Sequence, residues 1–185
     1  WVHFDVIASS HLQRARQTAD ALFQSNHQNN PNCQRLISNG FGEMRFGDFE
    51  GLALRGPHCT PETTQSFQKI NNQMKLDKTV QWPGVDGESI GQVEDRVRKA
   101  LLEDVLSDND DGENNVQKNI GIVAHGRLNN ILLASLLKGD GQYFYEYHQE
   151  NCCINVLDQN QQDGSFQPLV INYNDHMKKQ PEPEK

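Results

Sequence analysis

The stretch FDVIASSHLQRARQTADALF, residues 4–23, changes its pattern of apolar side chains at its centre. Phe4, Val6 and Ile7 are aromatic or β-branched and run into two serines, which predicts a short buried strand. After the serines, apolar residues recur at helical spacing, at positions 12, 15, 19, 22 and 23. A strand that turns at once into a helix is the half-unit of an α/β fold.

The turn between this strand and this helix is a candidate anion site. The first N–H groups of a helix lack partners, and the helix dipole is positive there. Arg14 lies in the first helical turn, and its planar guanidinium matches phosphate oxygens. Arg14 and Ser9 are therefore candidate substrate-binding residues. The alternative is a solvated surface arginine in a helix that Ser9 or Ser10 caps.

Composition narrows the class of protein. A chain of 185 residues can bury a core and predicts one domain. The net charge of −8 argues against nucleic acid as the main partner, and no apolar run is long enough to span a bilayer. The four cysteines show no C-x-x-C spacing, which favours reduced thiols in an intracellular protein over disulfides or a zinc site.

Residues 40–52, GFGEMRFGDFEGL, predict an ordered loop, because glycines alternate with phenylalanines that anchor it. Glu43 and Glu50 are its candidate proton donors, since a partly apolar setting lets a carboxyl group hold a proton near neutral pH. The alternative is that both glutamates are solvated.

The next segment predicts an excursion from the sheet and then a clear helix. Residues 53–85 contain prolines and one expected helix, 61–74, and suit a lid or specificity segment. Ser89 and Gln92 form a capping box that opens a helix to about Leu106. Residues 107–115, SDNDDGENN, are expected to be a solvated turn and lack the ligand spacing of a calcium loop.

Residues 119–137, NIGIVAHGRLNNILLASLL, repeat the strand-to-helix pattern. Residues 120–124 predict a buried strand, His125 and Gly126 end it, and residues 128–137 predict an apolar helix. Ligands of open α/β sheets bind at this edge, so His125 is a candidate catalytic residue. The alternative is a structural histidine.

The remaining residues predict a hairpin and a tail. Residues 152–157 and 166–173 are expected strands joined by a loop with Asp163 and Gly164. Residues 174–185 are charged and contain prolines, so we expect a disordered tail after a domain at 1–173.

Five motifs in order carry a family resemblance: SSHLQRARQTA, EMRFGDFEG, DGES, VAHG and NCCINVL. Over residues 4–157 the chain resembles the histidine phosphatase (phosphoglycerate mutase-like) superfamily. The resemblance implies a three-layer α/β/α fold with a mainly parallel sheet. It also implies phosphoryl transfer through a phosphohistidine, in a pocket of two arginines and two histidines, without a metal or cofactor.

The resemblance assigns roles to residues of this chain. Arg14 matches the pocket arginine, His125 the second pocket histidine that hydrogen-bonds the phosphoryl group, and Glu43 the acid that protonates the leaving group. Ser9 and Gly126 are the further expected substrate-binding residues. Converging cationic donors suit phosphoryl transfer, which needs positioning and charge neutralisation.

The nucleophile of the family pattern is missing. It belongs to an R-H-G motif on the first strand, and the 185 residues contain no R-H-G. We therefore expect an N-terminally truncated domain that lacks its first strand and is inactive as given. His3, His11 and His58 are poor replacements, because none ends a buried strand before a glycine.

Arg127 also departs from the family pattern, in which a small residue is common. It either contacts phosphate or points outward, and the pattern favours outward. The resemblance thus predicts a cytoplasmic phosphomonoester phosphatase with a small phosphorylated metabolite as substrate. A phosphoglycerate-type mutase and a non-catalytic phosphate-binding or interaction module of the same fold remain the alternatives, and the oligomeric state is open.

Overall fold

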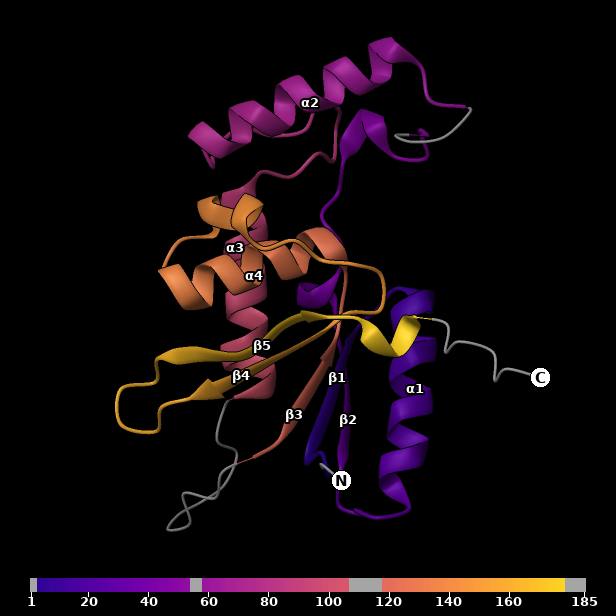
Figure 1. Cartoon of the computed structure of the whole chain (residues 1–185), viewed down its shortest axis with the longest axis vertical. Coiled ribbons are helices and arrows are strands. Elements are labelled where there is room, and N and C mark those ends of the chain that lie inside the picture. The colour runs from indigo at the N-terminus through magenta and orange to yellow at the C-terminus, as the bar shows by residue number, and fades with distance from the viewer. Residues whose placement is uncertain (1–2, 54–57, 107–117, 179–185) are drawn as a thin grey trace, which may run out of the picture.

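A parallel sheet forms the centre of the fold. The computed structural model describes residues 3–53, 58–106 and 118–178. Within them, the sheet has the strand order β2-β1-β3, and β1 pairs in parallel with both neighbours (Figure 1). The strands are β1 (Val6–Ser10), β2 (Gln34–Ser38) and β3 (Ile120–Val123). The predicted strand-to-helix turns therefore lie on neighbouring strands.

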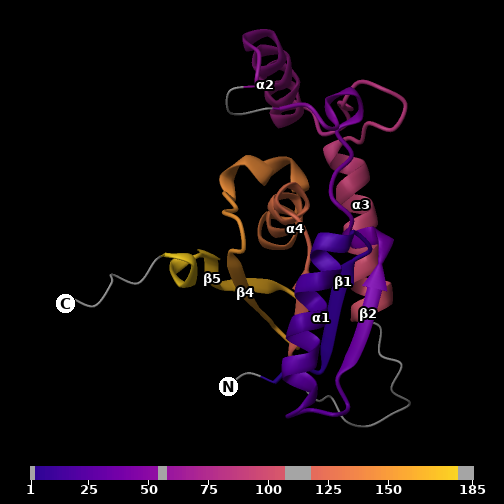
Figure 2. The same ribbon diagram turned by 90° about the vertical axis from the view of Figure 1, so that its right-hand side faces the viewer.

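Helices cover both faces of this sheet, which confirms the predicted α/β/α sandwich. The helices of the layers are α1 (Gln13–His27) on one side and α3 (Ile90–Ala100) with α4 (Gly126–Lys138) on the other (Figure 2). Alternate residues of β1 point to opposite faces. Ile7 packs in a cluster with Ala19 of α1, whereas Val6 and Ala8 pack in the large core with α3 and α4.

The start of α3 follows the predicted signal. Ser89 and Gln92 form both hydrogen bonds of the capping box at the start of α3. A π-helical turn, Leu101–Val105, continues α3 to Leu106. α4 ends at Gly139, which has a left-handed φ of 78° that favours glycine.

The predicted excursion is an arm that carries α2 (Pro61–Leu76). In Figure 1 it lies at the far end of the molecule from the strands. Met74 is buried, and Phe67 stacks on Trp82 with ring centroids 4.6 Å apart. The loop after β2 is ordered, as expected, and contains the short 3-10 helices Asn39–Phe41 and Gly47–Phe49. A further 3-10 segment, Gly141–Glu146, follows α4.

The predicted hairpin is present as an antiparallel pair, β4 (Ile154–Gln159) and β5 (Phe166–Tyr173). It forms a sheet of its own. Ile154 and Val156 of β4 are 47% and 40% exposed, which is unusual for apolar strand residues. The expected tail begins with a 3-10 turn, Asp175–Met177, so ordered structure continues beyond residue 173. Residues 179–185 lie outside the described part.

The expectation that β3 is a buried strand is wrong. All four of its residues are only half-buried, whereas every residue of β1 is buried. The physical reason is its place in the sheet, because in the described residues β3 pairs only with β1. The expected solvated turn at 107–115 lies outside the described residues. In the described part of the chain, no helix is both long and apolar enough to cross a membrane.

Candidate active site

The two strand-to-helix turns meet at the carboxyl end of the sheet. Ser9 of β1 lies opposite Val123 of β3, so the residues that follow the two strands are neighbours. His125 forms the N-cap of α4 and is only 6% exposed. Its Nε2 is buried and has no hydrogen-bond partner among the described residues. A buried polar atom without a partner marks a place where a ligand atom can complete the pairing.

The surroundings of His125 oppose a positive charge on its ring. The pKa of His125 is lowered from 6.5 to about 4, chiefly by burial and to a lesser extent by the positive charges of Arg14, His11 and Arg96. The imidazole is therefore neutral near pH 7. A neutral ring can still donate one N–H to a phosphoryl oxygen. An anion bound beside it would offset the nearby positive charges.

This shifted pKa predicts that His125 destabilises the fold in acid. Between pH 6.5 and 4 the unfolded chain binds the proton that the folded chain excludes, so stability falls as the pH is lowered. The shift corresponds to a loss of at most ~3 kcal/mol. In His125→Asn, the unfolding free energy from urea titrations at pH 7 and pH 4.5 should differ less than in the wild type. An equal difference in both proteins would show that His125 is not held neutral.

Arg14 is exposed at the start of α1, and no described residue is hydrogen-bonded to its guanidinium. Its positive charge nevertheless contributes to the lowered pKa of His125. Ser9, the other predicted binding residue of this turn, is fully buried and accepts a hydrogen bond from Arg35 Nη2 at 2.8 Å. Arg35 also pairs with Asp20. Ser9 thus ties β1 to β2 beneath the turn.

Glu43 contacts the N-terminus of α4. Its Oε1 accepts from the backbone N–H groups of Met44 at 2.9 Å and Leu128 at 3.0 Å, and its Oε2 accepts from Arg127 N–H at 3.3 Å. A carboxylate at a helix N-terminus satisfies unpaired N–H groups and complements the dipole. These bonds bring the predicted acid of the 40–52 loop beside the turn that carries His125.

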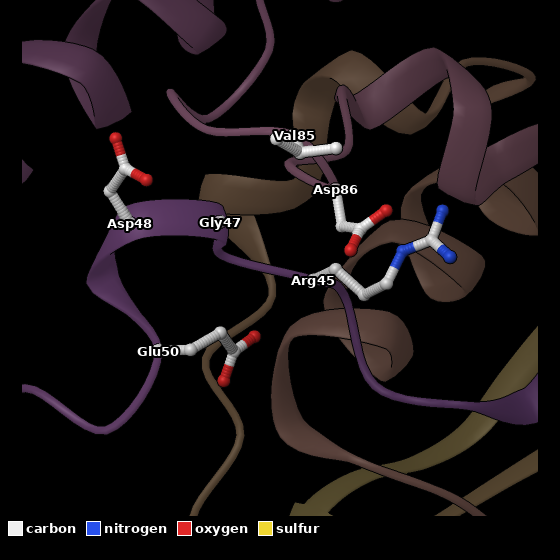
Figure 3. A pocket seen from close by; sticks show the side chains of 6 residues that line it. All are labelled: Arg45, Gly47, Asp48, Glu50, Val85 and Asp86. Carbon is white, nitrogen blue, oxygen red and sulfur yellow. The ribbon is translucent and has the colours of Figure 1, made fainter.

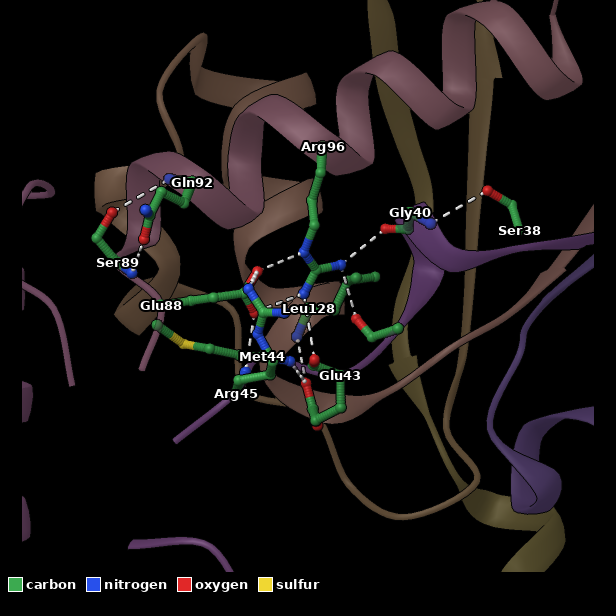
Figure 4. A network of polar contacts seen from close by, with 11 residues as sticks. Ser38, Gly40, Glu43, Met44, Arg45, Glu88, Ser89, Gln92, Arg96 and Leu128 are labelled. Carbon is green, nitrogen blue, oxygen red and sulfur yellow. Dashed lines mark hydrogen bonds and ion pairs between the residues drawn. The ribbon is translucent and has the colours of Figure 1, made fainter. Parts of the chain in front are cut away.

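Arg96 of α3 fixes the backbone of this loop (Figure 4). Its guanidinium donates to the carbonyl oxygens of Gly40, Gly42 and Glu43 at 2.8, 2.9 and 3.1 Å. It also forms a bidentate pair with the buried carboxylate of Glu88. Burial alone would raise the pKa of Glu88, but the bonds from Arg96 and from the Arg45 backbone hold that pKa below its usual range. The loop is therefore held rigidly next to the site.

Arg127 does not point outward, contrary to expectation. Its guanidinium lies over the ring of Phe144, 4.7 Å from the centroid, and its side chain is half-buried. Desolvation lowers the pKa of this arginine, partly offset by the charge of Glu43. Gly126, the predicted binding glycine, is exposed, and a Cβ added there would meet nothing within 4 Å. The space over its backbone is open to a ligand.

Glu50, the second candidate acid, lies elsewhere. It lines a depression of about 430 Å³ together with Arg45, Asp48 and Asp86 (Figure 3). One of its oxygens accepts from Phe46 N–H at 2.8 Å. The described residues include no cluster of three or more His, Cys, Asp or Glu side chains that would hold a metal ion. Of the two loop acids, only Glu43 touches the N-terminus of α4.

Sequence reasoning missed two residues of this site. Arg96 carries no local sequence signal, because the carbonyl groups that it binds lie more than 50 residues away along the chain. His11 was considered only as a nucleophile and set aside. The structure places it near enough to His125 for its charge to act on that ring. Its place directly after a strand that ends at a candidate anion site was the available signal.

Solved structures with a similar fold include two phosphatases. A mycobacterial glucosyl-3-phosphoglycerate phosphatase in complex with inorganic phosphate matches with a TM-score of 0.69 and 24% identity, over 91% of this chain and 76% of that one. The alpha-ribazole phosphatase from Shigella flexneri matches with a TM-score of 0.64 and 22% identity, over 93% of this chain and 75% of that one. None of the curated proteins compared matches this chain.

At these identities the solved structures show a shared fold, and the sequence match decides the family. The sequence profile described as "Histidine phosphatase superfamily (branch 1)" matches residues 2–172, which include both strand-to-helix turns and the hairpin. The chain therefore belongs to branch 1 of the histidine phosphatase superfamily.

Proposed function

We propose that the protein is a phosphomonoester phosphatase that acts through a phosphohistidine on a small phosphorylated metabolite. One observation carries the proposal: the unpartnered Nε2 of His125 is buried just after β3, beside the β1 turn that leads into the helix carrying Arg14. Arg14 lies in the first turn of the helix after β1, and His125 follows β3. Because β1 and β3 are neighbouring parallel strands, both residues lie at the edge where α/β proteins bind ligands. Arg14 would hold two phosphoryl oxygens, and His125 would donate to a third.

In the proposed reaction, a histidine nitrogen attacks phosphorus while the bond to the ester oxygen breaks. Glu43 gives its proton to the leaving oxygen, and its carboxylate later takes a proton from the water that attacks the phosphohistidine. The exposure of Arg14 supports a phosphatase over a mutase, because water reaches the site. The free thiols of all four cysteines support a reducing compartment such as the cytoplasm.

A non-catalytic phosphate-binding module is the second candidate. The observation in its favour is that the 185 residues contain no R-H-G, so the attacking histidine of the proposal is not supplied by this chain. Both candidates predict that inorganic phosphate binds at Arg14 and His125. Only the phosphatase predicts that addition of the nucleophile produces turnover.

Proton donation by Glu43 makes a separate prediction for a version of the protein that turns over substrate. Glu43→Gln keeps an oxygen that can accept from Met44 and Leu128 N–H, so the loop should stay in place. Turnover of an alkyl phosphate, a poor leaving group, should fall by about 100-fold, the lower end for general acid catalysis. Turnover of an aryl phosphate should fall much less. Steady-state kinetics with both esters measures the two losses of turnover. Equal losses would show that Glu43 is not the proton donor.

A further inference from the structure

His11 lies at the rim of the candidate active site. It follows directly after β1, and its side chain is exposed. Its ring is against the backbone of Gly42, where an added Cβ would lie 2.9 Å from Cε1 and 3.4 Å from Nδ1 of His11. The ring thus bridges from the β1 turn to the loop that Arg96 fixes.

The ring of His11 is also free to bind. No described residue is hydrogen-bonded to its nitrogens, and the edge nearer Gly42 is the Nδ1–Cε1 edge. Ser9 of β1 lies opposite Val123 of β3, so His11 and His125, each two residues further along, follow neighbouring parallel strands at the same edge of the sheet. His11 is exposed, whereas His125 is buried. His11 is therefore an exposed residue at the same sheet edge as the buried His125.

We propose that His11 is a specificity-determining residue that binds a hydroxyl group on the alcohol portion of the substrate. The inference rests on the proposed function, because it takes Arg14 and His125 as the phosphoryl contacts. The alcohol portion of a bound phosphomonoester must extend from the buried site toward solvent, which brings it past the exposed ring of His11. An imidazole nitrogen donates or accepts, and a hydroxyl group does both. The substrate class is therefore phosphomonoesters of polyols.

The loop is shaped to leave room for this ring. Gly42 has φ −61° and ψ 153°, a conformation that any residue can adopt, so its lack of a side chain is not a backbone requirement. The nearest groups to an added Cβ are His11 Cε1 and the carbonyl oxygen of Asn39 at 3.1 Å. Gly42→Ala should therefore displace the His11 ring while keeping the histidine.

The test uses isothermal titration calorimetry on the 185-residue chain with two esters of the same carbon skeleton. Glycerol 2-phosphate carries two hydroxyl groups that isopropyl phosphate lacks, and inorganic phosphate reports on the phosphoryl contacts alone. In His11→Phe, which keeps ring bulk, the Kd for glycerol 2-phosphate should rise about three- to tenfold, the scale of one neutral hydrogen bond. The Kd values for isopropyl phosphate and inorganic phosphate should change less than twofold.

Two further variants sharpen this comparison. Gly42→Ala should cause the same selective loss, and adding it to His11→Phe should cause little more, since both changes remove one contact. His58→Phe is the matched control, because His58 is an exposed histidine of the arm, and it should change none of the three affinities.

Each outcome bears on a different part of the account. A loss in His11→Phe that is equal for all three ligands, or absent for glycerol 2-phosphate, overturns the assignment of His11. Failure of the wild-type chain to bind inorganic phosphate overturns the proposed function itself. Selective loss for glycerol 2-phosphate alone supports both.

Discussion

Replacing Arg14 by alanine should weaken the binding of inorganic phosphate by roughly 30- to 1000-fold, or about 2–4 kcal/mol. The guanidinium has no hydrogen-bond partner among the described residues. Its charge acts on His125, whose buried Nε2 is also without a partner among them. A bound phosphate would desolvate both partners, which makes the loss of one of them costly. Isothermal titration calorimetry measures the affinity.

Arg14→Lys and Arg16→Ala are the comparison variants. Lysine keeps the charge but loses the planar fork, so Arg14→Lys should recover only part of the affinity. Arg16 is also an exposed arginine of α1, two residues further along and therefore on another side of the helix. Arg16→Ala should leave affinity unchanged. An Arg14→Ala variant that binds phosphate as tightly as the wild type would refute the assignment.

The second large effect is expected from adding the nucleophilic histidine of an R-H-G motif, which the 185 residues do not contain. The 185-residue chain should neither form a phosphohistidine nor turn over phosphomonoesters, because it contains no R-H-G. A version extended at its N-terminus by an apolar strand that ends in Arg-His-Gly should gain turnover, from no detectable rate to one readily measured. Phosphate release from p-nitrophenyl phosphate measures it.

The structure gives the reason why such a strand would fit. In the described residues β3 pairs on one side only and is half-buried, and apolar residues of β4 are exposed. An edge strand with unpaired backbone groups favours aggregation, so the extension should also raise the solubility of the protein. An extension ending in Arg-Ala-Gly is the matched control: it should restore solubility without turnover. Turnover with that control, or in the unextended chain, would place the nucleophile within the 185 residues.

Much of the fold follows from local sequence signals. The change of period after Ser10 and the capping box of Ser89 and Gln92 both involve residues close in the chain. α1 begins within three residues of Ser10, and α3 begins directly after Ser89. The burial of β3 could not be predicted in the same way. Its apolar residues indicate a strand, but burial depends on which strands pair with it.

The candidate site likewise combines residues that local sequence patterns indicate with contacts between residues far apart in the chain. Arg14 and His125 could be named as candidates from the sequence because each lies just after a strand whose pattern is local. The contact of Glu43 with the N-terminus of α4 joins residues 85 positions apart. Arg96 hydrogen-bonds a loop more than 50 positions away along the chain. The hydroxyl group of Ser9 accepts a hydrogen bond from Arg35. These contacts depend on tertiary packing, which no short motif encodes.

Acid-labile phosphate trapped on the protein tests the central claim most directly, since that claim is phosphoryl transfer to histidine at this site. The chain and its Arg-His-Gly extension are each mixed with ³²P-labelled phosphomonoester, quenched rapidly in base and denatured, and the label is mapped by its lability in acid. The account predicts label on the added histidine, its loss in Arg14→Ala of the extended protein, and none on the unextended chain. Label at a histidine of the unextended chain, or none on either protein, would contradict it.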